Sequence, residues 1–111
     1  MIGTTNVQAL AAFYEKVLQK PADMIEGDWH GWQVGSCFLS IGRHSKVTGQ
    51  AAEPQRIMFN LETLEVKAEF ERLKSVGATV VKEPYEMQGA WIATLADPDG
   101  NYFQLMTPWE S

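Results

Sequence analysis

Hydrophobic residues recur every three or four positions in two stretches of the chain, which is the spacing of one face of a helix. The first stretch follows Asn6, a residue type that favours a helix N-cap, and Pro21 ends it within a residue or two of Lys20. The second stretch follows Thr63, which we expect to cap it, and stops at Gly77, which readily takes the left-handed conformation of a helix end. The apolar positions are Leu10, Phe13, Val17 and Leu18 in the first helix and Val66, Phe70, Leu73 and Val76 in the second.

Short segments with strand composition, separated by turn residues, surround both predicted helices. Three strands are expected after the first helix, at residues 22–26, 32–34 and 37–41. We expect four glycines to interrupt this region: Gly27, Gly31, Gly35 and Gly42. One strand is expected before the second helix and three after it, at residues 56–61, 79–83, 91–95 and 102–106. Residues 97–101 (DPDGN) predict a tight turn between the last two strands, because proline fixes φ and glycine accepts positive φ.

Both halves of the chain therefore read as strand, helix, strand, strand, strand, with the first strand confined to the few residues before Asn6. The repeated order indicates an internal duplication. We expect a single domain made of module 1, about residues 1–45, and module 2, about residues 55–108, joined by a polar linker at residues 44–54. Two helices cannot cover both faces of all these strands, so one face of the sheet must look into a cavity, a partner subunit or water.

Composition and charge narrow the functions open to such a domain. The chain has 111 residues, and its 9 Lys and Arg against 14 Asp and Glu give a formal charge of −5, which argues against a nucleic-acid partner. Cys37 is the single cysteine, so an intramolecular disulfide and a CxxC site are excluded, and we expect a small buried side chain there. The first residues have neither a basic region nor a long apolar run, which predicts a cytoplasmic protein with no membrane partner.

Two stretches of the chain resemble the vicinal oxygen chelate superfamily, which includes glyoxalase I, extradiol dioxygenases, fosfomycin-modifying enzymes and bleomycin-resistance proteins. They are residues 10–18 (LAAFYEKVL) and 95–105 (LADPDGNYFQL), and the second is similar to the family's final hairpin. With the duplicated layout, the resemblance covers essentially the whole chain. It implies an α+β fold of the glyoxalase/bleomycin-resistance type, in which two βαβββ modules form a curled mixed sheet around a cavity, usually in a homodimer.

Metal enzymes of this superfamily hold a divalent ion through His, Glu or Gln on the first and last strands of each module, and the ion chelates two substrate oxygens. The resemblance places Gln104 where these enzymes carry Glu, Arg56 at the His position of the second module, and Ser40 at the fourth-strand position. The first-strand ligand would lie before Met1. The fixed charge of Arg56 disfavours a cation, and Ser40 and Gln104 are weak ligands alone. We therefore predict no cofactor, with a divalent metal as the alternative.

Alternation along the strands of the second module gives a set of candidate ligand-binding residues. In the last strand, Tyr102, Gln104 and Met106 are expected to face the cavity, whereas Phe103 and Leu105 face the helices. The cavity-facing residues of the first strand of this module are expected to be Arg56, Met58 and Asn60, and Ser40 is a further candidate ligand-binding residue in the first module. A guanidinium in a cavity would bind a carboxylate or a phosphate, and the alternative is a salt bridge or an edge position open to water.

Four tryptophans are many for a chain of this length. Trp29, Trp32 and Trp91 border or begin segments expected to line the cavity, and they are suited to form walls that stack on a planar or cationic ligand. The alternative is that these side chains fill the core or a dimer interface. Trp109 is expected to pack at a subunit edge.

Three functions remain open. The first, which we favour, is a metal-independent protein that binds, and sequesters or carries, an aromatic or charged small molecule. The second is a metal-dependent lyase, isomerase or dioxygenase of the same superfamily, with an altered site made from Gln104, a histidine and a residue of the dimer partner. The third is an interaction domain whose cavity is filled by Met and Trp side chains. His30 and His44 are expected to be solvent-facing or loop residues, and Asp97 and Asp99 to shape their turn.

Overall fold

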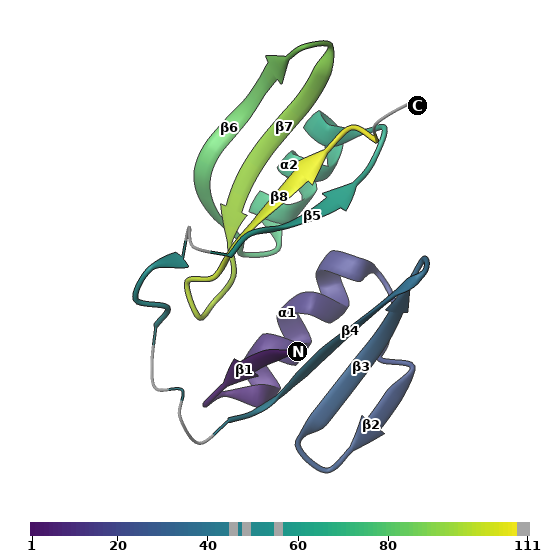
Figure 1. The fold of residues 1–111 in the computed structure, drawn as a ribbon, viewed down its shortest axis with the longest axis vertical. Helices are drawn as coiled ribbons and strands as arrows, with labels where there is room; N and C mark the ends of the chain where they lie inside the picture. Colours follow the sequence, from purple (N-terminus) through teal and green to yellow (C-terminus); the bar gives the residue numbers. More distant parts are fainter. Residues whose placement is uncertain (45–46, 48–49, 55–56, 109–111) are drawn as a thin grey trace. The chain divides into compact units, whose positions relative to one another are not determined.

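The structure repeats one order of elements, strand, helix, strand, strand, strand, in each half of the chain (Figure 1). The computed structural model describes residues 1–44, 47, 50–54 and 57–108. The chain divides into an N-terminal unit, Met1–Gln50, and a C-terminal unit, Ala51–Ser111. Each unit holds one helix and one four-stranded mixed sheet, which confirms the predicted α+β class with two βαβββ modules. Within the described residues, no helix is long and apolar enough to cross a membrane.

In the N-terminal unit the strand order is β1-β4-β3-β2, with β1 parallel to β4 and the other neighbours antiparallel. The elements are β1 (Ile2–Thr4), α1 (Val7–Leu18), β2 (Met24–Glu26), β3 (Trp29–Val34) and β4 (Cys37–Arg43). The helix begins where the sequence predicts, because Asn6 Oδ1 accepts a hydrogen bond from the backbone N–H of Ala9 at 3.2 Å. It ends with Gln19 in the left-handed conformation, two residues before Pro21.

Two glycines that were expected to interrupt strands lie inside them. β3 and β4 both extend beyond the predicted segments, so Gly31 and Gly42 belong to the sheet. A Cβ atom at Gly31 would collide with the ring of Phe38, and one at Gly42 would lie 3.0 Å from Cδ1 of Trp29. These glycines therefore leave room for two aromatic rings that lie against the sheet, which is a known reason for glycine within a strand.

The C-terminal unit has the strand order β5-β8-β7-β6, again with its first and last strands parallel. Its elements are β5 (Phe59–Glu62), α2 (Val66–Ser75), β6 (Thr79–Met87), β7 (Ala90–Ala96) and β8 (Tyr102–Met106). The bounds of β8 match the prediction. β5 starts at Phe59 and not at residue 56, and Arg56 itself lies outside the described residues. β6 continues through Pro84 instead of ending at Glu83.

Thr63 does not cap α2, contrary to the expectation. The helix begins at Val66 with Glu65 in the N-cap position, and no side chain caps it. The hydroxyl of Thr63 accepts a hydrogen bond from the backbone N–H of Glu65 at 3.1 Å, so it shapes the approach to the helix and not its first turn. The predicted apolar stripe is buried at Val66, Phe70 and Leu73.

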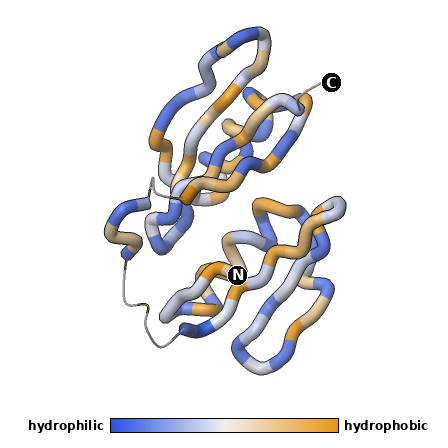
Figure 2. Tube along the Cα trace, viewed as in Figure 1, coloured by the Kyte–Doolittle hydropathy of each residue, from blue (hydrophilic) through white to orange (hydrophobic). Residues whose placement is uncertain are grey.

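Burial alternates along β8 as the sequence predicts. Phe103 and Leu105 are buried. The half-buried residues of this strand are Tyr102, Gln104 and Met106. Hydrophobic and hydrophilic positions also alternate along β5, and both kinds of position occur in each unit (Figure 2). Since α2 packs against β6, β7 and β8, one face of this sheet is the helix side, and the half-buried residues of β8 lie on the other.

Asp23 links the end of α1 to β3 and makes stability depend on pH in the acid range. Its Oδ2 atom accepts hydrogen bonds from the backbone N–H of Gln33 at 2.7 Å and from Lys20 Nζ at 2.9 Å. The bond from Gln33 first, and then that from Lys20, hold the pKa of Asp23 below its ordinary value of 3.8. A carboxylate with a lowered folded-state pKa stabilises the fold above its unfolded pKa, and this contribution is lost as the pH falls through the folded-state pKa.

We expect Asp23→Asn to reduce the free energy of unfolding near neutral pH, because the amide cannot replace the charged acceptor. The difference from the unsubstituted chain should shrink once the pH is below the lowered pKa of Asp23, where the carboxyl is protonated in both states. Urea denaturation followed by circular dichroism, at neutral pH and at acid pH, measures this. A difference that does not change with pH would show that Asp23 acts only as a neutral hydrogen-bonding group.

Candidate functional site

Four hydrogen-bonding side chains form a row across the face of the C-terminal sheet that is turned away from α2. The strand register pairs Asn60 of β5 with Gln104 of β8. It also pairs Gln104 with Thr94 of β7, and Thr94 with Lys82 of β6. Paired residues of neighbouring strands point to the same face, so the four side chains lie next to one another. We call this side of the sheet, with the row and Tyr102 beside it, the polar face.

The centre of the row is a contact between Gln104 and Thr94. Gln104 Nε2 donates a hydrogen bond to Thr94 Oγ1 at 3.2 Å, and Thr94 is only 6% exposed. Because the Thr94 oxygen accepts this bond, its own hydrogen is available to another acceptor. Within the described part of the chain, the side-chain carbonyl oxygen (Oε1) of Gln104 and the side-chain amide of Asn60 have no hydrogen-bond partner. The row therefore has unused hydrogen-bonding capacity.

Aromatic rings lie beside the row on the same face. Tyr102 is paired with Ala96 and is two residues before Gln104 on β8, so its half-buried ring points the same way. Tyr85 of β6 is also half-buried, and Lys82 Nζ lies 5.4 Å from the centre of its ring. A ligand on the polar face would thus meet amides, a hydroxyl and an ammonium group, with phenol rings on either side.

The structure brings together three of the residues that the sequence proposes for ligand binding: Asn60, Tyr102 and Gln104 all belong to the polar face. Met58 precedes β5 and is 41% exposed, outside the strand ladder. Arg56 lies outside the described residues, as does Trp109. Thr94 and Lys82 were not among the residues predicted from the sequence. Alternation within the predicted strand at residues 91–95 could have identified Thr94 once Gln104 was placed.

Trp91 does not belong to the polar face, although the sequence analysis grouped it with Gln104. The register pairs its neighbour Ile92 with Met106, so Trp91 points to the α2 side. There, Lys67 Nζ lies 3.8 Å from the centre of the Trp91 ring, and the backbone N–H of Trp91 donates to Thr107 Oγ1 at 3.0 Å. The ring is therefore held by its own unit.

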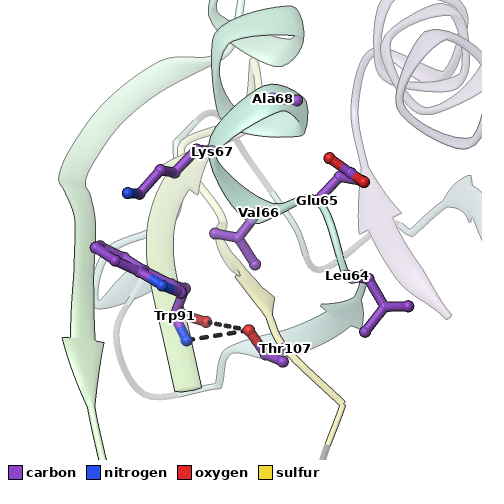
Figure 3. Close-up of a pocket in the computed structure, with 7 residues that line it drawn as sticks. All are labelled: Leu64, Glu65, Val66, Lys67, Ala68, Trp91 and Thr107. Carbon is purple, nitrogen blue, oxygen red and sulfur yellow. Dashed lines mark hydrogen bonds between the residues drawn. The ribbon is translucent and has the colours of Figure 1, made fainter. Parts of the chain in front are cut away.

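A small hollow lies beside Trp91 at the start of α2 (Figure 3). It is lined by Leu64, Glu65, Val66, Lys67, Ala68, Trp91 and Thr107, and its volume is about 210 Å³. In the close-up, the side chain of Lys67 extends toward the Trp91 ring, whereas Leu64 and Glu65 lie on the other side of the hollow. Ligand pockets usually measure roughly 300–1,000 Å³, so this hollow is small for a drug-sized molecule.

The N-terminal sheet has a different character on the face turned away from α1. Its register places Trp29 and Phe38 on this side together with Gly31 and Ser40, and we call it the aromatic face. The two rings have their centres 5.9 Å apart, inclined by 31°, and both lie close to Gly31. Two predicted ligand-binding residues, Trp29 and Ser40, therefore share one face, but they belong to the N-terminal unit.

Trp32 is part of the core, so its predicted place in a ligand-binding wall is wrong. It is 0% exposed, and its Nε1–H donates to the backbone carbonyl of Lys20 at the end of α1, at 3.0 Å. Trp29 and Trp32 are three residues apart in one strand, so they point to opposite faces. The alternative that the sequence analysis left open, a tryptophan that fills the core, is correct for this residue.

The two histidines and the single cysteine occupy separate positions in the N-terminal unit. His30 lies in β3, half-buried, with its ring stacked on Trp32 at a centroid distance of 6.3 Å. His44 is exposed. Cys37 was expected to be buried, but it is exposed because it opens β4 at the end of a hairpin turn. Within the described residues, there is no group of three or more His, Cys, Asp or Glu side chains that could hold a metal ion.

Comparisons with known proteins agree with this architecture. The model of a family described as a glyoxalase-like domain matches residues 1–106. A solved glyoxalase/bleomycin resistance protein from Albidiferax ferrireducens T118 is 18% identical, with a TM-score of 0.78 over 98% of this chain and 95% of the other. A glyoxalase/bleomycin resistance protein/dioxygenase family enzyme from Burkholderia phytofirmans PsJN is 24% identical, with a TM-score of 0.74 over 96% and 93%. At these identities the likeness establishes the fold. No curated protein matches the chain significantly.

Proposed function

This chain belongs to the glyoxalase-like domain family of the vicinal oxygen chelate superfamily, and we propose that it binds a small molecule on the polar face without a metal ion. The observation that carries the proposal is the row from Asn60 through Gln104 and Thr94 to Lys82, which crosses all the strands of one sheet. Binding sites place a few convergent polar groups next to apolar and aromatic surface. The row and its flanking tyrosines have that composition.

The side chains of the row favour binding without a metal ion, because they are not the usual ligands of divalent ions. Divalent ions in proteins are held by carboxylate, imidazole or thiolate groups. The row offers two amides and a hydroxyl, and its remaining member, Lys82, is a cation that would repel a metal ion. These residues do not fit a divalent metal centre at Gln104. The second function left open by the sequence, a metal-dependent enzyme, would need ligands from elsewhere.

The proposal is tested by NMR titration of the full chain with a library of small aromatic and aliphatic acids, amides and amines. We expect binding compounds to shift the backbone amide signals of β7 and β8 around Thr94 and Gln104. Gln104→Ala should weaken the binding of such compounds about tenfold, because one hydrogen bond to the ligand is lost together with the contact between Gln104 and Thr94. Gln8→Ala, an exposed glutamine on α1, is the control and should leave the affinity unchanged.

Three results would contradict the proposal. Compounds that shift only signals of the N-terminal unit would move the site to the aromatic face, and no binding across the library would favour the interaction domain. The metal-dependent alternative is tested by measuring the metal content of the purified protein and its thermal shift with Mn, Fe, Ni, Co and Zn. One tightly held ion per chain, lost in Gln104→Ala, would establish the metal-dependent alternative, because an ion that binds the folded state stabilises it.

A further inference from the structure

The pairing of β6 with β7 is irregular on both sides of Lys82. Val80 lies opposite Leu95, Lys82 opposite Thr94, and the register shifts between these two pairs. In an unbroken antiparallel ladder that starts from Val80 and Leu95, Val81 would lie opposite Thr94. Lys82 would then be opposite Ala93, on the α2 side of the sheet. The extra residue in β6 is a β-bulge.

The bulge determines what occupies the end of the polar row. With regular pairing that position would be a valine, whereas the irregular strand places a lysine there. A second shift follows before Tyr85, which pairs with Ile92 and so lies on the same side as Lys82. The contact between Lys82 Nζ and the Tyr85 ring is consistent with this placement. β-Bulges re-aim side chains and are frequent beside functional sites, and Pro84 between the two residues has no N–H to pair.

Lys82 is free of ion pairs within the described residues, and so is Glu83, which follows it in the strand. Glu86 pairs with Trp91 and lies on the α2 side. Glu62 is on the polar face, but on β5 at the opposite edge of the sheet. With neighbouring strands about 4.8 Å apart, that edge is roughly 14 Å away. Within the described residues, no carboxylate therefore forms an ion pair with Lys82, and Glu62, which the register places on the same face, lies at the far edge of the sheet.

We propose that the polar face binds an anionic oxygen group, a carboxylate or a phosphate, between Lys82 and Thr94, with the uncharged part of the ligand lying along the row toward Gln104 and Asn60. This rests on the proposed function and specifies the ligand class of that site. The ammonium of Lys82, the hydrogen of the Thr94 hydroxyl and the second amide hydrogen of Gln104 supply the donors. Charged acceptors make the stronger hydrogen bonds with such groups.

The test compares matched probes on the full chain by NMR titration at low salt. Benzoate and benzamide have similar shape and differ in charge, and inorganic phosphate is titrated separately. We expect benzoate to bind about tenfold more tightly than benzamide, with amide shifts at Lys82 and Thr94, and to weaken as salt is added. Binding of phosphate at the same amides, without benzoate, would assign the phosphate class. Equal binding of benzoate and benzamide, with no phosphate binding, would overturn the inference.

Two variants test the role of Lys82 and of the bulge. Lys82→Gln should remove the preference for benzoate over benzamide, whereas Lys74→Gln, an exposed lysine on α2, should not. The double variant V81K/K82V keeps composition and net charge but moves the lysine by one position. It should lose the preference as completely as Lys82→Gln. A double variant that still prefers benzoate would show that general charge, and not the bulged register, attracts the anion.

The two proposals can fail separately. If neutral compounds from the library bind the polar face but no anion is preferred, the site stands and the ligand class is wrong. If no compound, charged or neutral, shifts the signals of β6, β7 and β8, then both proposals are wrong. Circular dichroism of each variant checks that the sheet is intact, so that a loss of binding reports on the site.

Discussion

Replacing Trp32 with alanine is expected to reduce the free energy of unfolding by about 3–5 kcal/mol, the range for truncation of a large aromatic side chain in a core. Trp32 is fully buried, and its indole N–H donates to the carbonyl of Lys20. The substitution leaves a cavity next to His30 and removes the partner of that carbonyl. Because small domains are stable by only about 5–15 kcal/mol, urea denaturation should show a much lower midpoint.

Trp29→Ala is the matched control, since the same side chain is lost from the same strand but from the opposite face. Trp29 is half-buried and packs on Phe38, so we expect a clearly smaller loss of stability. Trp32→Phe should fall between the two, because it refills most of the cavity without the N–H. If Trp32→Ala were as stable as Trp29→Ala, Trp32 would not be the core residue that its burial indicates.

The elements that the sequence predicts correctly are those whose signals are local. Asn6 and Pro21 bracket α1 because a side-chain cap and a missing N–H act within a few residues of themselves. The interrupted strands were mispredicted because the reason for Gly31 and Gly42 lies elsewhere in the chain. Their missing Cβ atoms make room for Phe38 and Trp29, and that packing is invisible until the strands are paired.

The candidate site was predictable as far as alternation holds. Counting in steps of two along each strand, from Arg56 in one and Gln104 in the other, placed Asn60, Tyr102 and Gln104 on one face, and the register agrees. The same counting fails for Lys82, because an inserted residue in β6 shifts the alternation by one position. The prediction for Trp32 was wrong because the predicted strand began at residue 32, whereas β3 begins at Trp29. With both residues in one strand, Trp29 and Trp32 point to opposite faces of the sheet.

Asp97→Ala is expected to reduce the free energy of unfolding by about 3 kcal/mol, because a buried hydrogen-bonding centre is lost. The sequence predicts that Asp97 shapes the turn, and its hydrogen bonds confirm this. Asp97 Oδ1 accepts hydrogen bonds from the backbone N–H groups of Asp99 and Asn101, both at 2.9 Å. Asn101 Nδ2 donates to Asp97 Oδ2 at 3.0 Å, and Asp97 is only 3% exposed. Urea denaturation of the variant measures the loss.

The neighbouring carboxylate provides the control for this turn. Asp99→Ala keeps the backbone N–H that donates to Asp97, and it removes a half-buried side chain that has no hydrogen bond or ion pair within the described residues, so it should stay within about 0.5 kcal/mol of the unsubstituted chain. Asp97→Asn keeps one acceptor oxygen without the charge and should lose less than Asp97→Ala. The turn fixes where β8 begins, and through β8 it fixes the register of Gln104 against Thr94. Asp97→Ala should therefore also weaken the binding of any compound at the polar face. If Asp99→Ala reduced the free energy of unfolding as much as Asp97→Ala, charge, and not the hydrogen bonds of Asp97, would hold the turn.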